Sequence, residues 1–229
     1  MAPRPIRSSP RRRIRSSPRR STATDEAPLP DHLKPDLRVL FAGINPGLRS
    51  AATGHHYAGR GNRFWRLLYD SGLTPEALSA ERDAEVLRWG YGLTNLVARP
   101  TSGVAGLDAA DFAAGRLELL EKIRTFRPAV VALVGLTVFE HLRATTARAR
   151  RAPGGRVGLQ RQSLHEARVF VLPNPSGRNT HFTYVEMLQL YRRLSRLLAA
   201  SAHDARRAPQ RSGERTTLPL RSRSGVRSR

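Results

Sequence analysis

Residues 39–47 read VLFAGINPG and residues 169–177 read VFVLPNPSG, and these two stretches decide the expected fold. In each, an apolar run rich in β-branched residues ends at Asn-Pro, and a glycine follows closely. Continuous apolar runs of this length are typical of strands buried on both faces of a parallel sheet. Proline fixes its own φ and restricts the preceding residue to extended conformations, so Asn45 and Asn174 are each expected at a strand end.

Segments with strand and helix patterns alternate along the centre of the chain. We expect strands at 37–43, 91–97 and 128–135, a strand hairpin within 156–173, and helices at 62–72, 74–89, 108–126, 136–144 and 183–200. This alternation predicts a parallel sheet sandwiched by helices. Ligands of such sheets bind beyond the carboxyl ends of the strands. The two Asn-Pro turns are therefore expected to form the walls of one site.

Two of these helices have recognisable starts. Thr74 followed by Pro75 predicts a helix start, with Ala77 among the residues facing inward. Asp108 is expected to cap the next helix, with Leu117 on its buried face.

The charge is unevenly distributed. The chain has a formal net charge of +22, of which residues 1–30 carry +6, residues 31–204 carry +9 and residues 205–229 carry +7. Both ends are Arg-rich and low in complexity, and RSSPRR occurs twice in the first 20 residues. We expect a disordered basic arm at 1–30, one α/β domain at 31–204 and a disordered basic tail at 205–229. Such a charge favours nucleic acid as the partner.

Several classes of site are not expected. The chain has no cysteine, which excludes disulfides, thiolate metal sites and cysteine nucleophiles. His55 and His56 are adjacent, with no carboxylate at ligand spacing, so we expect no metal and no cofactor.

No apolar run reaches the roughly 20 residues that a membrane helix needs. We expect a protein of the cytoplasm, associated with the nucleoid.

The segments GINPGLRSAATG, GNRFW, TNLVARPT and LPNPSG resemble, in matching order, the mismatch-specific uracil-DNA and thymine-DNA glycosylases. The resemblance covers about residues 36 to 200. It implies the three-layer α/β/α sandwich of the uracil-DNA glycosylase superfamily, with a mainly parallel central sheet. It also implies hydrolysis of the N-glycosidic bond of a flipped uracil, and of thymine or a damaged pyrimidine as further candidates.

The resemblance also assigns roles in the first turn. Asn45 would hold the attacking water, and the backbone N–H of Ile44 would lie near the oxygen of the departing base. Gly43 and Gly47 would let the backbone approach the base, and Tyr57 would stack on it. Ser50 is placed in the pocket turn, where a contact to the base and a structural role are equally open. Asp108 and Asp111 could assist, although capping is the favoured role of Asp108.

The second turn is expected to contact DNA. Asn174 would line the base pocket, while Ser176, Gly177, Arg178 and Asn179 would enter the space that the flipped base leaves. Relatives usually carry an apolar side chain where Arg178 stands. Arg178 could stack on the opposite guanine, donate to its acceptors or contact a phosphate.

The expected partner is duplex DNA with a G·U or G·T mismatch, bound by a monomer. The only lysines are Lys34 and Lys122, and neither is expected near either turn to form a Schiff base, which disfavours lyase chemistry. A catalytically inactive module that senses mismatches through the same pocket is the alternative.

Overall fold

The computed structural model describes residues 28–143 and 157–207, and of residues 202–207 only the helical backbone. The predictions for most of the two basic ends lie outside the described residues. Leu29 and Pro30, assigned to the basic arm from the sequence, are part of the folded structure, since Leu29 is buried. The last described helix likewise extends beyond residue 204. None of the described helices is long and apolar enough to span a bilayer.

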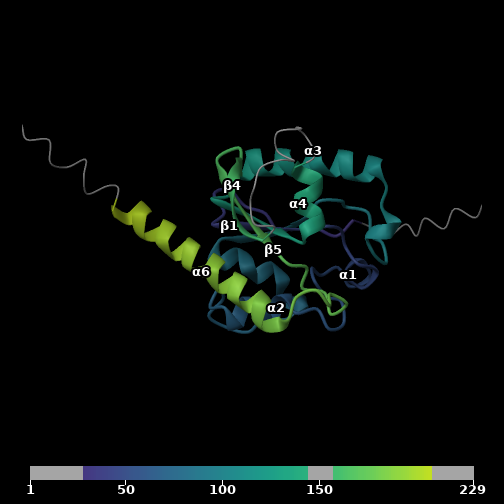
Figure 1. Ribbon diagram of the computed structural model, residues 1–229, viewed down its shortest axis with the longest axis horizontal. Coiled ribbons are helices and arrows are strands. Elements are labelled where there is room, and N and C mark those ends of the chain that lie inside the picture. Colours follow the sequence, from purple (N-terminus) through teal and green to yellow (C-terminus); the bar gives the residue numbers. More distant parts are fainter. Residues whose placement is uncertain (1–27, 144–156, 208–229) are drawn as a thin grey trace, which may run out of the picture.

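A five-stranded sheet forms the centre of the molecule (Figure 1). Its strands are β1 (Val39–Gly43), β2 (Tyr91–Asn95), β3 (Val130–Val134), β4 (Gly158–Leu164) and β5 (Ala167–Leu172), in the order β2-β1-β3-β5-β4. All neighbours pair in parallel except β4, which pairs antiparallel with β5 at the edge. The mainly parallel sheet and the hairpin predicted from the sequence are confirmed.

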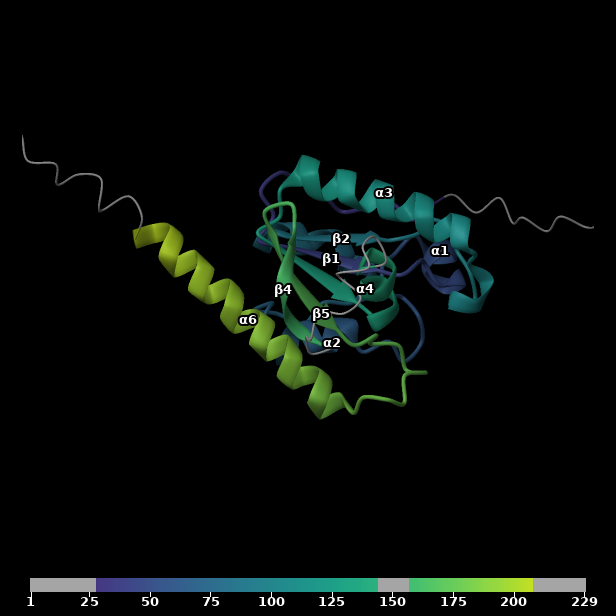
Figure 2. The same ribbon diagram turned by 45° about the horizontal axis from the view of Figure 1, so that its top comes forward.

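Helices cover both faces of the sheet (Figure 2). The face that carries Leu40 and Ala42 of β1 packs against α3 (Ala109–Phe126) and α4 (Leu136–Arg143). The face that carries Val39 and Phe41 packs against α2 (Phe64–Asp70), the 3₁₀ helix η1 (Ala80–Trp89) and α6 (Tyr184–Arg207). Because successive side chains of a strand alternate between its faces, each apolar strand supplies both cores. The three-layer α/β/α sandwich is confirmed.

The loop regions differ from the sequence prediction. The turn after β1 continues into a short helix, α1 (Leu48–Thr53), which was not predicted and which ends at Gly54 with φ 73°. The helix expected from Thr74 begins only at Ala80, and Ala77 is exposed. The backbone N–H groups of Leu73 and Thr74 both bond to the carbonyl of Leu68, so these residues belong to the turn that closes α2, with Gly72 at φ 72°.

Asp108 caps α3 as predicted. It forms a reciprocal capping box with Asp111, each side chain accepting from the other's backbone N–H at 2.9 Å. The predicted burial of Leu117 is wrong, because this side chain is 64% exposed. The buried face instead runs through Phe112, Gly115, Leu119 and Ile123. A glycine contributes no apolar side chain, so the sequence pattern did not reveal that Gly115 faces the sheet.

Gly115 is also the point of closest approach between α3 and the end of β2. A Cβ atom at this position would lie 2.0 Å from the carbonyl oxygen of Leu96. The substitution Gly115→Ala should therefore cost about 1–3 kcal/mol of folding free energy through overpacking, although alanine is the better helix former. Urea denaturation measures the loss. The exposed control Ala114→Gly should cost about 1 kcal/mol or less, and a G115A protein as stable as the wild type would contradict this packing.

Candidate functional site

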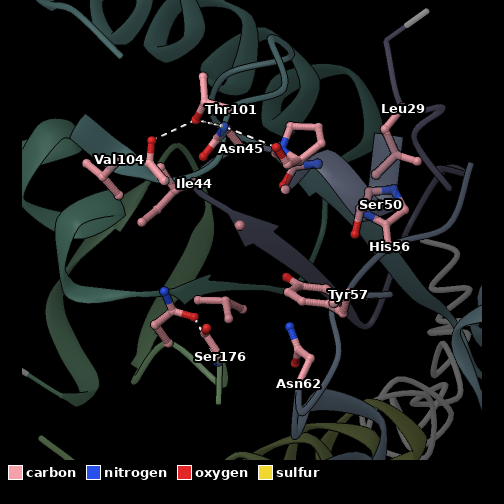
Figure 3. A pocket seen from close by; sticks show the side chains of 18 of the residues that line it. Leu29, Ile44, Asn45, Ser50, His56, Tyr57, Asn62, Thr101, Val104 and Ser176 are labelled. Atoms are coloured by element: carbon pink, nitrogen blue, oxygen red, sulfur yellow. Dashed lines mark hydrogen bonds between the residues drawn. The ribbon is translucent and has the colours of Figure 1, made fainter. Parts of the chain in front are cut away.

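A pocket opens at the carboxyl ends of the central strands, with a cavity volume of about 180 Å³ (Figure 3). Gly43, Ile44, Asn45, Pro46 and Gly47 of the turn after β1 form one wall. Asn174, Ser176 and Arg178 of the turn after β5 form another. The two Asn-Pro turns, far apart in sequence, therefore line one cavity.

The remaining predicted residues lie in or beside this pocket. Ser50 of α1 and Tyr57 of the following loop line it. The side chain of Ile44 is part of the core beneath the sheet edge. Gly177 and Asn179 belong to the second turn but are not among the lining residues. Residues 101–104 complete the lining, together with Leu29, His56, Gly59, Asn62, Asn95 and Val134, and none of these was predicted as a site residue from the sequence.

The side chain of Asn45 is held by its amide nitrogen. Nδ2 donates to Thr101 Oγ1 at 2.8 Å and to the carbonyls of Arg99 and Pro46, both at 3.1 Å. The backbone supports this arrangement, because the N–H of Thr101 donates to the carbonyl of Pro46 at 3.1 Å. All the hydrogen bonds of this side chain within the described residues use the nitrogen, so its carbonyl oxygen is free to accept.

The orientation of the Asn45 amide follows from donor and acceptor chemistry. Thr101 Oγ1 donates its only hydrogen to the carbonyl of Gly103 at 2.7 Å, so it can only accept from Asn45. Backbone carbonyls also only accept. A flipped amide would place its oxygen against three acceptors, and this is unfavourable. Oδ1 of Asn45 is therefore the atom available in the pocket (Figure 3).

Tyr57 is an aromatic residue that lines the pocket. One face of its ring stacks on the buried Phe64, with ring centroids 3.8 Å apart. The ring is only partly buried and lines the cavity, so it presents a flat apolar surface there. Tyr57 has φ 54°, a left-handed conformation that is uncommon for a bulky residue and is often found at functional sites. Its hydroxyl is buried and has no hydrogen-bond partner within the described residues, and this burial raises the pKa of Tyr57, which keeps the hydroxyl protonated.

The Tyr57 loop is held by a buried carboxylate. Asp83 of η1 is 3% exposed and accepts from the backbone N–H of His56 at 2.7 Å. Its Oδ1 also lies 3.1 Å from Nε2 of His32 and 3.3 Å from Nδ1 of His55. On the opposite side, Ser50 Oγ accepts from the N–H of Ala58 at 3.1 Å. Ser50 therefore has a structural role in this loop.

His56 connects the same loop to the start of the described chain. Its Nε2 lies 2.9 Å from the carbonyl of Pro30, which can only accept, so Nε2 carries the proton. Burial lowers the pKa of His56, which keeps the ring neutral at pH 7. In the described part of the chain, no group of three or more His, Asp or Glu side chains is arranged to hold a metal ion.

Asn95 is the functional candidate that sequence reasoning missed. It is the last residue of β2, and its Oδ1 lies 2.7 Å from the point where a Cβ on Gly43 would stand. Within the described residues its amide has no hydrogen-bond partner, so all of its donors and acceptors are available to a ligand. Its place at the carboxyl end of a strand was the available signal.

The second turn is ordered by its own asparagines. Asn174 Oδ1 accepts from the N–H of Ser176 at 3.0 Å, and Asn179 Nδ2 donates to the carbonyl of Asn174 at 2.8 Å. Arg178 is exposed and reaches over to the 101–104 loop, where Nη2 donates to the carbonyl of Ser102 at 2.9 Å. Arg178 thereby connects the turn after β5 to the loop of residues 101–104.

The pocket has no acidic side chain among its described lining residues. Asp108 and Asp111 are not among these residues, since they form the capping box and Asp111 also pairs with Arg99. The pocket therefore offers neutral hydrogen-bonding groups and a flat aromatic face, with the guanidinium of Arg178 at its border.

This geometry agrees with a comparison to known families. Residues 30–195 match the family model of the Uracil DNA glycosylase superfamily. The chain belongs to this superfamily. A solution NMR structure of a "putative Uracil DNA glycosylase" from Methanosarcina acetivorans is similar at 20% sequence identity and a TM-score of 0.48, over 74% of this chain and 98% of that chain. Membership of the superfamily supports uracil-DNA glycosylase activity and DNA as the substrate.

The Asp83 cluster predicts how stability depends on pH. Burial alone would raise the pKa of Asp83, but the close contact with His32 and the hydrogen bonds with the His56 N–H and with His55 have the larger effect and lower the pKa from 3.8 to about 2. Because the folded pKa is below the unfolded one, the stabilisation is complete above about pH 4 and is lost as the pH falls towards 2.

Asp83→Asn should therefore lower the free energy of unfolding by about 2 kcal/mol at pH 7 and by less in acid. Urea denaturation of both proteins between pH 2 and pH 7 measures the difference. Glu118→Gln, at an exposed position on α3, is the matched control and should change little. A difference in unfolding free energy between wild type and D83N that stays constant across this pH range would contradict the stabilising role of the Asp83 carboxylate.

Proposed function

We propose that this protein is a monofunctional DNA glycosylase that hydrolyses the N-glycosidic bond of uracil mispaired with guanine in duplex DNA. The observation that carries the proposal is the fixed amide of Asn45. Its nitrogen donates to three acceptors, and its oxygen faces a pocket whose described lining residues include no carboxylate. That oxygen accepts a hydrogen bond from the attacking water and aims it at the sugar carbon.

The pocket suits one pyrimidine base. A cavity of about 150 Å³ can hold a benzene ring, and the volume here is about 180 Å³. The exposed face of Tyr57 provides a stacking surface, and stacking of a base on an aromatic ring contributes about 1–3 kcal/mol. Asn95 offers a donor and an acceptor together, which complement the N3–H and O4 of uracil.

The chemistry depends on the leaving group. As the bond breaks, positive charge develops on the sugar and negative charge on the pyrimidine. Asn45 has no charge with which to stabilise the sugar cation. Stabilisation comes from donors directed at the base, namely the backbone N–H of Ile44 and the amide of Asn95, because fixed dipoles are effective where charge develops. Cleavage is therefore slow, and acidic leaving groups such as uracil are favoured over thymine.

Mismatch preference follows in part from the duplex. Flipping a base costs a few kcal/mol, and least where pairing is already weak, as in G·U and G·T pairs. The second turn fills the space that the base leaves, with Arg178 moving from Ser102 to the opposite guanine. One lesion needs one pocket, so the protein acts as a monomer. Its substrate is the DNA of the nucleoid, in the cytoplasm. Neither lysine lines the pocket, which leaves no amine for a Schiff base.

The test uses a labelled duplex with one G·U mismatch and a second with G·T. The protein should produce strand breaks only after alkali, because a monofunctional enzyme leaves an abasic site. Asn45→Ala should lower single-turnover excision by about 10²-fold or more, as removal of a fixed catalytic dipole does elsewhere, while binding to the duplex persists. Breaks without alkali, or an active N45A protein, would contradict the mechanism.

A catalytically inactive mismatch sensor is the second candidate, favoured by the absence of an acidic side chain in the described pocket. It predicts tighter binding to G·U than to G·C duplex with no excision by the wild type. The same assay therefore separates the two functions.

Thr101 tests the orientation of the amide. Thr101→Val keeps the shape of the side chain but removes one of the three acceptors of Asn45 Nδ2, so the amide is held less firmly by the carbonyls of Arg99 and Pro46 alone. We expect single-turnover excision to fall about fivefold, since one such hydrogen bond contributes about 1 kcal/mol, with DNA affinity unchanged.

Thr74→Val is the matched control. The Thr74 hydroxyl is buried and has no partner within the described residues, so its loss should leave excision unchanged. Equal rates for T101V and the wild type would show that Thr101 does not orient Asn45.

A further inference from the structure

Arg63 joins the two halves of the site. It lies between Asn62, which lines the pocket, and Phe64, on which Tyr57 stacks. Its guanidinium donates from Nη2 to the carbonyls of Ser176 at 2.9 Å and Asn179 at 3.1 Å, and from Nε to the carbonyl of Pro175 at 3.4 Å. Its backbone N–H donates to the same Pro175 carbonyl at 2.9 Å. One residue thus binds three carbonyls of the second turn.

The backbones meet at the same junction. A Cβ on Gly177 would lie 2.8 Å from the carbonyl oxygen of Gly61. The second turn therefore packs directly against the loop that carries Asn62 and Arg63. A side chain at position 177 would have to push the two segments apart, because backbone on both sides cannot yield.

The guanidinium of Arg63 is committed to this junction. It forms no ion pair with any described residue, and every hydrogen bond that it donates ends on a carbonyl of residues 175–179. Arg66, one turn along α2, differs from it. Arg66 is exposed, pairs with Asp70 on the same helix and stacks over Tyr184. The two arginines carry the same charge, but of the two only Arg63 binds the turn of residues 175–179.

We propose that Arg63 is a positioning residue that fixes the turn of residues 175–179 against the Tyr57 loop, so that the base pocket and Arg178 act on DNA as one rigid unit. The inference rests on the proposed glycosylase function. Flipping a base costs a few kcal/mol, and a group that fills the vacated space stabilises the flipped state, so the turn and the pocket should engage together. A turn displaced by about 1 Å can cost up to about 10²-fold in rate.

The test compares Arg63→Met, Arg63→Lys and Gly177→Ala with the control Arg66→Met. Single-turnover excision of uracil from a G·U duplex is measured at saturating protein, together with thermal stability and amide hydrogen exchange. R63M should lose about tenfold or more in rate, and R63K should recover part of it, because an ammonium cannot span the carbonyls as a planar fork does. G177A should resemble R63M without any change of charge.

Hydrogen exchange provides a readout that a general loss of stability would not reproduce. The N–H groups of Ser176, Asn179 and His181 are bonded within the turn. In R63M they should exchange about tenfold faster, while the amides of β1 and β3 keep their wild-type rates.

Faster exchange at the turn together with slower excision supports the proposal. R63M behaving like R66M would overturn it, as would either change without the other. Faster exchange throughout the sheet would overturn it too, by showing a folding defect. A wild-type protein that does not excise uracil would instead end the proposed function, and this inference with it.

Discussion

The amide nitrogen of Asn45 has three acceptors around it, and the site depends on this constraint. Thr101 and the carbonyls of Arg99 and Pro46 receive its hydrogen bonds, and the Thr101 hydroxyl is in turn committed to Gly103. An aspartate at position 45 would place a negative charge against these oxygens. The surroundings of this residue therefore match an amide, and no carboxylate is among the described residues that line the pocket.

A second constraint keeps the site together. The turn after β1 is anchored to the 99–103 loop, whereas the turn after β5 is anchored to the loop before α2 through Arg63 and the contact of Gly61 with Gly177. Arg178 links the turn after β5 to the 99–103 loop by donating to the carbonyl of Ser102. Four segments from separate parts of the chain thus surround one cavity, and the parallel sheet beneath them sets their spacing.

Much of this arrangement could be predicted from the sequence, because β-branched runs that end at Asn-Pro specify both the strands and their polar ends. The side-chain partners could not. Asn95 and Thr101 both lie in the segment TNLVARPT, but the sequence does not give their partners. Only the fold shows that Thr101 meets Asn45 and that Asn95 meets Gly43. The burial on α3 was missed for a similar reason. Leu117 was expected on the buried face, but Gly115 faces the sheet there, because the close contact between helix and strand leaves room only for a residue without a side chain.

The most direct test is a crystal structure of the protein bound to a G·U duplex whose uridine carries a 2′-fluoro group, which slows cleavage by destabilising the sugar cation. The account predicts uracil stacked on Tyr57, Asn45 Nδ2 still bonded to Thr101, and Asn45 Oδ1 on a water facing the sugar carbon. Uracil bound elsewhere, or an Asn45 amide turned with its nitrogen towards the sugar, would contradict it.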